Sequence, residues 1–124
     1  MILGVGVDVI EVERIRETLA RHGERFLQRV FTAEELALAP AADPAPFFAG
    51  RWAAKEAVSK CLGTGIGVHC GWTDICVLRE PGGRPVIELR GKGAETAAAL
   101  GIRVIHVSIS HLKHLGCASA VAEQ

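Results

Sequence analysis

The first apolar pattern of the chain alternates over residues 2–10 and predicts a strand, because β-branched residues recur there between glycines. One face of this strand carries four large apolar side chains, those of Leu3, Val5, Val7 and Val9. We expect that face to lie against the core. On the other face Gly4 and Gly6 precede Asp8, and two residues without side chains allow another backbone or a ligand to approach closely.

Helical spacing of apolar residues replaces this alternation in the next part of the chain. We expect a helix over about 11–22 and a short helical turn over about 24–30. The residues from Thr32 to Glu35 form a capping box, which starts a third helix that ends by Pro40.

The longest predicted helix runs from Pro44 to about Leu62, with Asp43 as its N-cap and Gly63 as its C-cap. Its buried stripe is expected to consist of apolar residues, namely Phe47, Ala54, Val58, Cys61 and Leu62.

Glu56 and Lys60 are four residues apart on this helix and therefore project together from the opposite face. They precede a loop that contains Gly63, Thr64 and Gly65. The same pattern is also typical of a surface ion pair followed by a glycine cap.

The remainder of the chain reads as strands around one short helix. The predicted strands cover 72–78, 85–90, 102–110 and 117–121, and the predicted helix covers 94–100. In the third strand Ile105, Val107 and Ile109 share one face, opposite His106, Ser108 and Ser110. We therefore expect one α+β domain over residues 1–124. It has an N-terminal strand, a helical half with one long central helix, and then a mostly antiparallel sheet.

The composition favours a small domain that associates with copies of itself. Of the 124 residues 49% are hydrophobic, and the mean hydropathy is +0.27. A domain of this size buries only about two-thirds of the surface of its unfolded chain, so the apolar excess suggests a homo-oligomer. No apolar run is long enough to cross a membrane, and we expect no secretory signal, because the first residues lack a basic region followed by a clean apolar stretch.

The charges balance, with 14 basic and 14 acidic residues, which argues against nucleic acid or a membrane surface as a partner. None of the four cysteines forms a C-x-x-C pair, so we expect reduced thiols in a cytoplasmic protein. A zinc site built from them and His69, His111 or His114 would have poor ligand spacing.

Asp8 and Glu56 are candidate ligands of a divalent cation. Mg²⁺ takes one or two protein carboxylates and completes its shell with water and substrate phosphates. Lys60 would neutralise charge on the same phosphates, and the loop after the helix can offer backbone N–H groups, a set that fits phosphoryl transfer. An alternative role for Asp8 is to cap the first helix, since Asp8 and Glu11 have the spacing of a capping box.

Two other classes of function compete with phosphoryl transfer. One is a metal-dependent nuclease or phosphohydrolase that uses Asp8 and Glu56, with Asp74 as a third carboxylate. The neutral charge of the chain argues against nucleic-acid binding. The other is a non-enzymatic module that only binds partners.

Three segments carry a resemblance to a known family. They are G-V-G-V-D-V-I-E-V-E-R-I at 4–15, R-V-F-T-A-E-E-L at 29–36 and G-R-W-A-A-K-E-A-V-S-K-C-L-G-T-G-I-G at 50–67. W-T-D-I at 72–75, G-R-P at 83–85 and H-V-S-I-S-H at 106–111 extend it. In these segments the chain resembles the holo-(acyl-carrier-protein) synthases, the small bacterial 4′-phosphopantetheinyl transferases.

The resemblance implies a magnesium-dependent enzyme of fatty acid or polyketide biosynthesis. Such enzymes move the phosphopantetheine arm of coenzyme A onto a serine of an acyl carrier protein. By position, Asp8 and Glu56 would hold Mg²⁺, and Lys60 would contact the pyrophosphate; all three would be catalytic. Contacts with coenzyme A are implied for Arg51, Lys55, Lys60, Gly63, Thr64, Gly65 and His111.

The resemblance also implies a homotrimer with active sites between subunits. In this family the first helix meets an acidic helix of the carrier protein. Arg14, Arg21 and Arg25 are spaced seven and four apart and would form the docking stripe. Acidic residues are interleaved with them, so a merely solvated face is the alternative.

Overall fold

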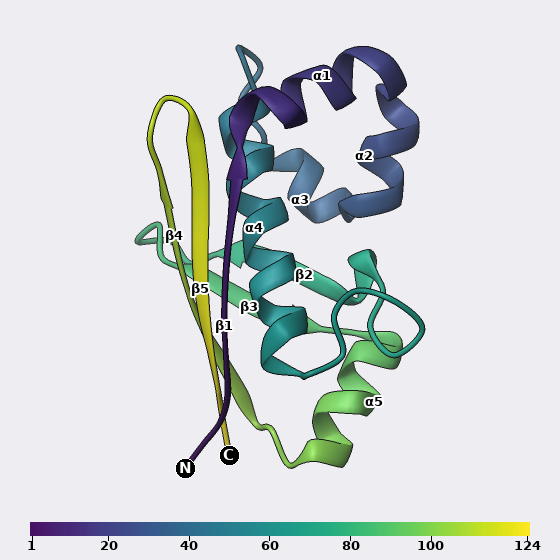
Figure 1. Ribbon diagram of the computed structural model, residues 1–124, viewed down its shortest axis with the longest axis vertical. Helices are drawn as coiled ribbons and strands as arrows, with labels where there is room; N and C mark the ends of the chain where they lie inside the picture. The colour runs from purple at the N-terminus through teal and green to yellow at the C-terminus, as the bar shows by residue number, and fades with distance from the viewer.

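The computed structural model describes residues 1–124 and has the α+β architecture that the sequence predicts. The chain begins with strand β1 (Ile2–Glu11), followed by four helices and then by two hairpins that flank one more helix (Figure 1). The helices are α1 (Val12–His22), α2 (Glu24–Val30), α3 (Ala33–Ala37), α4 (Ala45–Cys61) and α5 (Gly91–Leu100). The other strands are β2 (Ile75–Arg79), β3 (Pro85–Leu89), β4 (Val104–His111) and β5 (Leu115–Glu123). No helix is long and apolar enough to cross a membrane.

The strands form two antiparallel sheets. β1, β5 and β4 are hydrogen-bonded in that order, while β2 and β3 pair only with each other. β3 lies beside β4 without joining its ladder (Figure 1). In the larger sheet the first and last strands are neighbours, so that Ile2 lies opposite Glu123. The three-stranded sheet and α4 therefore form the body of the molecule, with α1, α2 and α3 at one end and α5 at the other (Figure 1).

Helix α4 packs against β1, β5 and β4 and is covered on nearly all sides. Twelve of its seventeen residues are buried, which makes the prediction of a single buried stripe too narrow. Ala54, Val58 and Cys61 are buried as expected, whereas Phe47 is only half-buried. The helix is central because many of its residues are alanine, which lets neighbouring elements approach closely.

The prediction for the faces of β1 is wrong. Its four large apolar side chains, at Leu3, Val5, Val7 and Val9, are 40–66% exposed. The face that carries Gly4 and Gly6 lies on α4 instead. The period of two identified which residues share a face, but the glycine face is the one that can pack closely on the helix.

Two of the predicted caps are also wrong. Glu11, not Asp8, precedes α1, and no side chain caps that helix. Pro44 occupies the N-cap position of α4. The carboxylate of Asp43 instead accepts two hydrogen bonds from Arg16, of 3.1 and 3.2 Å. The predicted capping box from Thr32 to Glu35 is confirmed.

The C-terminal half matches the prediction except at element boundaries. Residues 72–74 form a 3₁₀ turn rather than the start of β2, because the Asp74 side chain turns back to accept a hydrogen bond of 2.9 Å from the amide of Gly71. α5 begins three residues earlier than predicted, at Gly91. The alternation predicted for β4 is confirmed, with Ile105 buried and Ser108 exposed.

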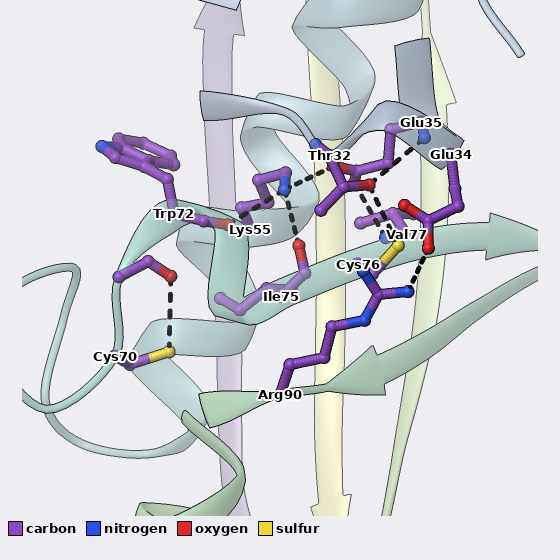
Figure 2. Close-up of polar contacts among 11 residues, drawn as sticks. Thr32, Glu34, Glu35, Lys55, Cys70, Trp72, Ile75, Cys76, Val77 and Arg90 are labelled. Carbon is purple, nitrogen blue, oxygen red and sulfur yellow. Dashed lines mark hydrogen bonds and ion pairs between the residues drawn. The ribbon is translucent and has the colours of Figure 1, made fainter. Parts of the chain in front are cut away.

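A buried ion pair joins α3 to α4 (Figure 2). Nζ of Lys55 lies 2.7 Å from Oε1 of Glu35, and neither side chain is exposed. Lys55 also donates to the backbone carbonyls of Trp72 and Ile75. Glu35 accepts from the amides of Thr32 and Val77, each at 2.8 Å. Burial lowers the pKa of Lys55, and the attraction of Glu35 opposes that effect.

We predict that Lys55→Met lowers the free energy of unfolding by about 3–5 kcal/mol, because the buried carboxylate of Glu35 then lacks its cation. The measurement is urea unfolding at one protein concentration. Arg16→Met is the matched control, since Arg16 pairs with Glu13 and Asp43 only at the surface, where water screens the charges and the loss should be much smaller. Equal losses in the two variants would contradict the assigned role of the buried pair.

Candidate active site

Asp8, Glu56 and Lys60 lie together where β1 crosses α4. Nζ of Lys60 lies 3.3 Å from Oδ1 of Asp8 and donates a hydrogen bond of 2.9 Å to the carbonyl of Val7. The Lys60 side chain is 49% exposed and that of Asp8 is 19% exposed. The two elements thus converge in space, with the ammonium group open to a ligand.

The environment of Glu56 disfavours its negative charge. Partial burial raises the pKa of Glu56, and the nearby carboxylate of Asp8 raises it further, while Lys60 opposes the change. Two carboxylates that repel each other are an arrangement that a divalent cation stabilises. Two is also the number of protein carboxylates that Mg²⁺ commonly takes, so this donor set fits that ion.

The site lacks the further carboxylates of a two-metal nuclease. No group of three or more His, Cys, Asp and Glu side chains is arranged to enclose a metal ion. Asp74, the candidate third carboxylate, ends the 3₁₀ turn, and its side chain reaches the first turn of α5. There its Oδ2 accepts hydrogen bonds from the amides of Gly71 and Gly93, at 2.9 and 3.2 Å. The nuclease alternative is therefore not supported.

The loop after α4 does not offer the free amides that we expected. Gly63 and Gly65 adopt positive φ angles of 76° and 65°. The amides of Gly63, Thr64 and Gly65 all donate to the last turns of α4, the first to Lys60 and the other two to Ser59. These amides are occupied because the last carbonyls of a helix have no donor within the helix and take one from the loop that follows. Charge on a bound phosphate would therefore be met mainly by Lys60.

Two other residues assigned to coenzyme A contact lie inside the protein. Lys55 is fully buried in its pair with Glu35, so the prediction that it contacts a ligand is wrong for this structure. Arg51 is 7% exposed and stacks on the ring of Phe47 at 4.2 Å. Its Nε is buried without a hydrogen-bond partner. Burial lowers the pKa of Arg51, and the positive charge of Arg79 lowers it further, so the charged guanidinium is disfavoured there. A bound anion would stabilise that charge.

His111 is exposed at the end of β4. It lines a polar hollow of about 480 Å³ together with Arg16, Lys113 and His114. None of the residues that line this hollow belongs to the cluster of Asp8, Glu56 and Lys60. One chain alone therefore does not bring His111 to that cluster.

The three arginines of the predicted docking stripe are exposed. Arg14 and Arg21 lie on α1, Arg25 lies on α2, and none of the three forms an ion pair. Sequence reasoning missed a groove of about 330 Å³ beside them, between α1 and α2. Trp52 and Trp72, whose ring centroids lie 4.2 Å apart with the planes tilted by 34°, line it together with Arg14 and Arg29. The only sequence signal was that the chain contains two tryptophans, because nothing in the pattern showed that they meet.

Comparison with known proteins identifies the family. A family model described as the 4′-phosphopantetheinyl transferase superfamily matches residues 4–109. The chain belongs to this superfamily. A protein of Koribacter versatilis named holo-[acyl-carrier-protein] synthase is 44% identical over 99% of both chains. One of Maridesulfovibrio salexigens with the same name is 39% identical over the full length of both.

Solved structures of transferases from this superfamily share the fold. The holo-[acyl-carrier-protein] synthase of Neisseria meningitidis aligns over the full length of both chains with a TM-score of 0.92 and 32% identity. That of Helicobacter pylori, determined in complex with coenzyme A, aligns with a TM-score of 0.85 and 30% identity. The alignment covers 96% of this chain and 99% of that one. The likeness therefore extends over the whole chain and includes the segments that carry Asp8, Glu56 and Lys60.

Proposed function

We propose that this transferase moves the 4′-phosphopantetheine arm of coenzyme A onto a serine of an apo acyl carrier protein and releases adenosine 3′,5′-bisphosphate. The observation that carries the proposal is the convergence of Asp8, Glu56 and Lys60 in a chain whose relatives are named holo-[acyl-carrier-protein] synthase. The coenzyme A complex of the Helicobacter pylori protein supports the choice of donor substrate.

In this reaction the serine oxygen forms a bond to the phosphorus that carries the pantetheine arm, and the pyrophosphate bridge breaks. Glu56 is the side chain proposed to accept the serine proton, directly or through a water molecule. Lys60, with its half-exposed ammonium group, neutralises the charge that develops on the departing phosphate. Mg²⁺ held by Asp8 and Glu56 would supply further positive charge for the pyrophosphate.

The active enzyme is proposed to be a homotrimer. The exposed apolar face of β1 continues into Cys117 and Val121 of β5, which are half-buried. A face of this kind is costly to leave in water. A neighbouring copy would cover it and would also explain why His111 lies apart from the cluster within one chain. His111 would then meet coenzyme A at a site built by two subunits.

The carrier protein is proposed to dock on the face formed by α1 and α2. Arg14, Arg21 and Arg25 are free to meet acidic residues of a partner, and the groove beside them is lined by tryptophan and other apolar side chains. Charges at the rim of an interface act mainly on the rate of encounter, whereas a buried apolar contact holds the complex together.

The proposed function predicts transfer itself. Apo acyl carrier protein incubated with this enzyme, coenzyme A and Mg²⁺ should gain the mass of one phosphopantetheine arm, and a chelator should abolish the gain. Asp8→Asn and Glu56→Gln should each lower the rate at least about 100-fold. Both rates are followed by intact mass spectrometry.

Folding serves as the control for these variants. Because the pKa of Glu56 is raised in the folded state, its carboxylate opposes folding at neutral pH, and removing the charge relieves that effect. Metal-free Glu56→Gln should therefore be at least as stable as the parent. A variant that is folded and transfers at nearly the parental rate would overturn the assignment of the site.

The docking face predicts a change in only one Michaelis constant. Arg14→Glu should raise KM for the carrier protein about tenfold at low ionic strength and leave KM for coenzyme A unchanged. Lys92→Glu is the control, because Lys92 is exposed on α5 at the opposite end of the molecule (Figure 1). An unchanged KM for the carrier protein in Arg14→Glu would rule out this part of the docking face.

The oligomer is tested by sedimentation. The parent protein should have three times the 13.2 kDa mass of one chain, and Val7→Lys should dissociate it and abolish transfer. Ala99→Lys, on the exposed side of α5, should do neither. A parent protein that sediments at 13.2 kDa under assay conditions would refute the trimer.

A further inference from the structure

Gly4 and Gly6 bring β1 into direct contact with the backbone of α4. A Cβ atom added at Gly6 would lie 2.0 Å from the carbonyl oxygen of Ala57 and 3.1 Å from Cβ of Lys60. One added at Gly4 would lie 2.2 Å from the carbonyl oxygen of Cys61. Neither glycine has a positive φ, so the requirement is for space and not for an unusual backbone conformation.

The contacts repeat because the steps of the two elements match. Two residues of a strand advance about 6.6 Å, and four residues of a helix advance about 6 Å. Gly4 therefore meets Cys61 and Gly6 meets Ala57, one helical turn earlier. Asp8 is the next residue on this face of β1 and the first of the three that has a side chain.

We propose that Gly6, supported by Gly4, positions Asp8 for cation binding by fixing the distance between β1 and α4. This inference rests on the proposed function, because it concerns the cation assigned to Asp8 and Glu56. Lys60 shares the same contact, since its Cβ lies beside Gly6 and its Nζ reaches Asp8. Gly6 is thus a positioning residue for Asp8 and for Lys60.

A side chain at position 6 would displace β1 far enough to disturb cation binding by Asp8. Real Cβ atoms essentially never come within 3.0 Å of another heavy atom, so an alanine at position 6 must move the strand by about 1 Å from its 2.0 Å approach. The obstacle is a backbone carbonyl of a buried helix and cannot swing aside. Mg²⁺ binds oxygen at about 2.0–2.1 Å with near-ideal octahedral geometry, so a shift of 1 Å removes a ligand.

Gly116 provides a matched control within the same sheet. It lies on β5 and also packs on α4, where an added Cβ would be 3.1–3.3 Å from atoms of Ala49. Ala49 is nearer the start of the helix than the cluster is. An alanine at position 116 therefore disturbs the same packing layer by a few tenths of an ångström, away from Asp8.

In the experiment, Mn²⁺ is titrated into the metal-free protein, and the electron paramagnetic resonance signal of the free ion reports how much is bound. The dependence of the transfer rate on Mg²⁺ concentration is measured in parallel. We expect Gly6→Ala to bind Mn²⁺ about 10–100-fold more weakly, as for other changes that disturb the support of a metal ligand. Gly116→Ala should stay within about threefold of the parent. Adding Asp8→Glu to Gly6→Ala should restore part of the affinity, because the longer side chain spans the wider gap.

Rescue by Asp8→Glu distinguishes positioning from a general loss of packing. Asp8→Glu alone should weaken Mn²⁺ binding, which keeps the inference testable if Gly6→Ala does not fold. Parental Mn²⁺ affinity in folded Gly6→Ala, or in Asp8→Glu, would overturn the inference, as would an equal loss in Gly116→Ala. A parent that binds Mn²⁺ but transfers nothing would refute the proposed function and leave the inference intact.

Discussion

The buried pair of Glu35 and Lys55 is the constraint on which the other contacts of α4 depend. Lys55 ties the middle of that helix to α3 and to the strand that begins at Ile75, through an ammonium group with no access to water. Charges so enclosed tolerate little movement, because any separation leaves one of them without compensation. Glu56 follows Lys55 directly in the helix, so the bond that fixes the rotation of α4 also fixes the direction of Glu56.

The opposite side of α4 is held in a different way. There the backbone of β1 at Gly4 and Gly6 contacts the backbone of α4 directly, with no side chain between them. Close packing, and not an ion pair, sets the separation of the two elements. The helix is thus fixed from one side by electrostatics and from the other by van der Waals contact. The cluster of Asp8, Glu56 and Lys60 lies next to the close contact of β1 with α4, since Asp8 follows Gly4 and Gly6 on the same face of the strand. Its geometry is therefore set by the interior of the protein and not by the side chains of the cluster alone.

The sequence predicted local features well and the partners of those features poorly. The ends of α1, α2 and α4 and the capping box at Thr32 were found to within a residue or two, because they depend on neighbours in the chain. The period of two in β1 revealed two faces but not which one the core would cover. Lys55 was misassigned because its partner, Glu35, lies on another helix. The amides of the loop after α4 were wrongly predicted to be free, because they donate to the last carbonyls of that helix. The nearness of Asp8 to Glu56 was inferred from metal chemistry and from family resemblance, since no local pattern links them.

The pairing of β1 with β5 has a consequence for the order in which the protein matures. β5 is the only strand beside β1, and it is also the last to leave the ribosome. Until it is made, the strand that carries Asp8 has no ladder to join. The longest-range pairing in the chain therefore completes the site, and pairings of this kind are slow to form. A nascent or C-terminally truncated chain would contain every residue of the cluster and yet have no assembled site.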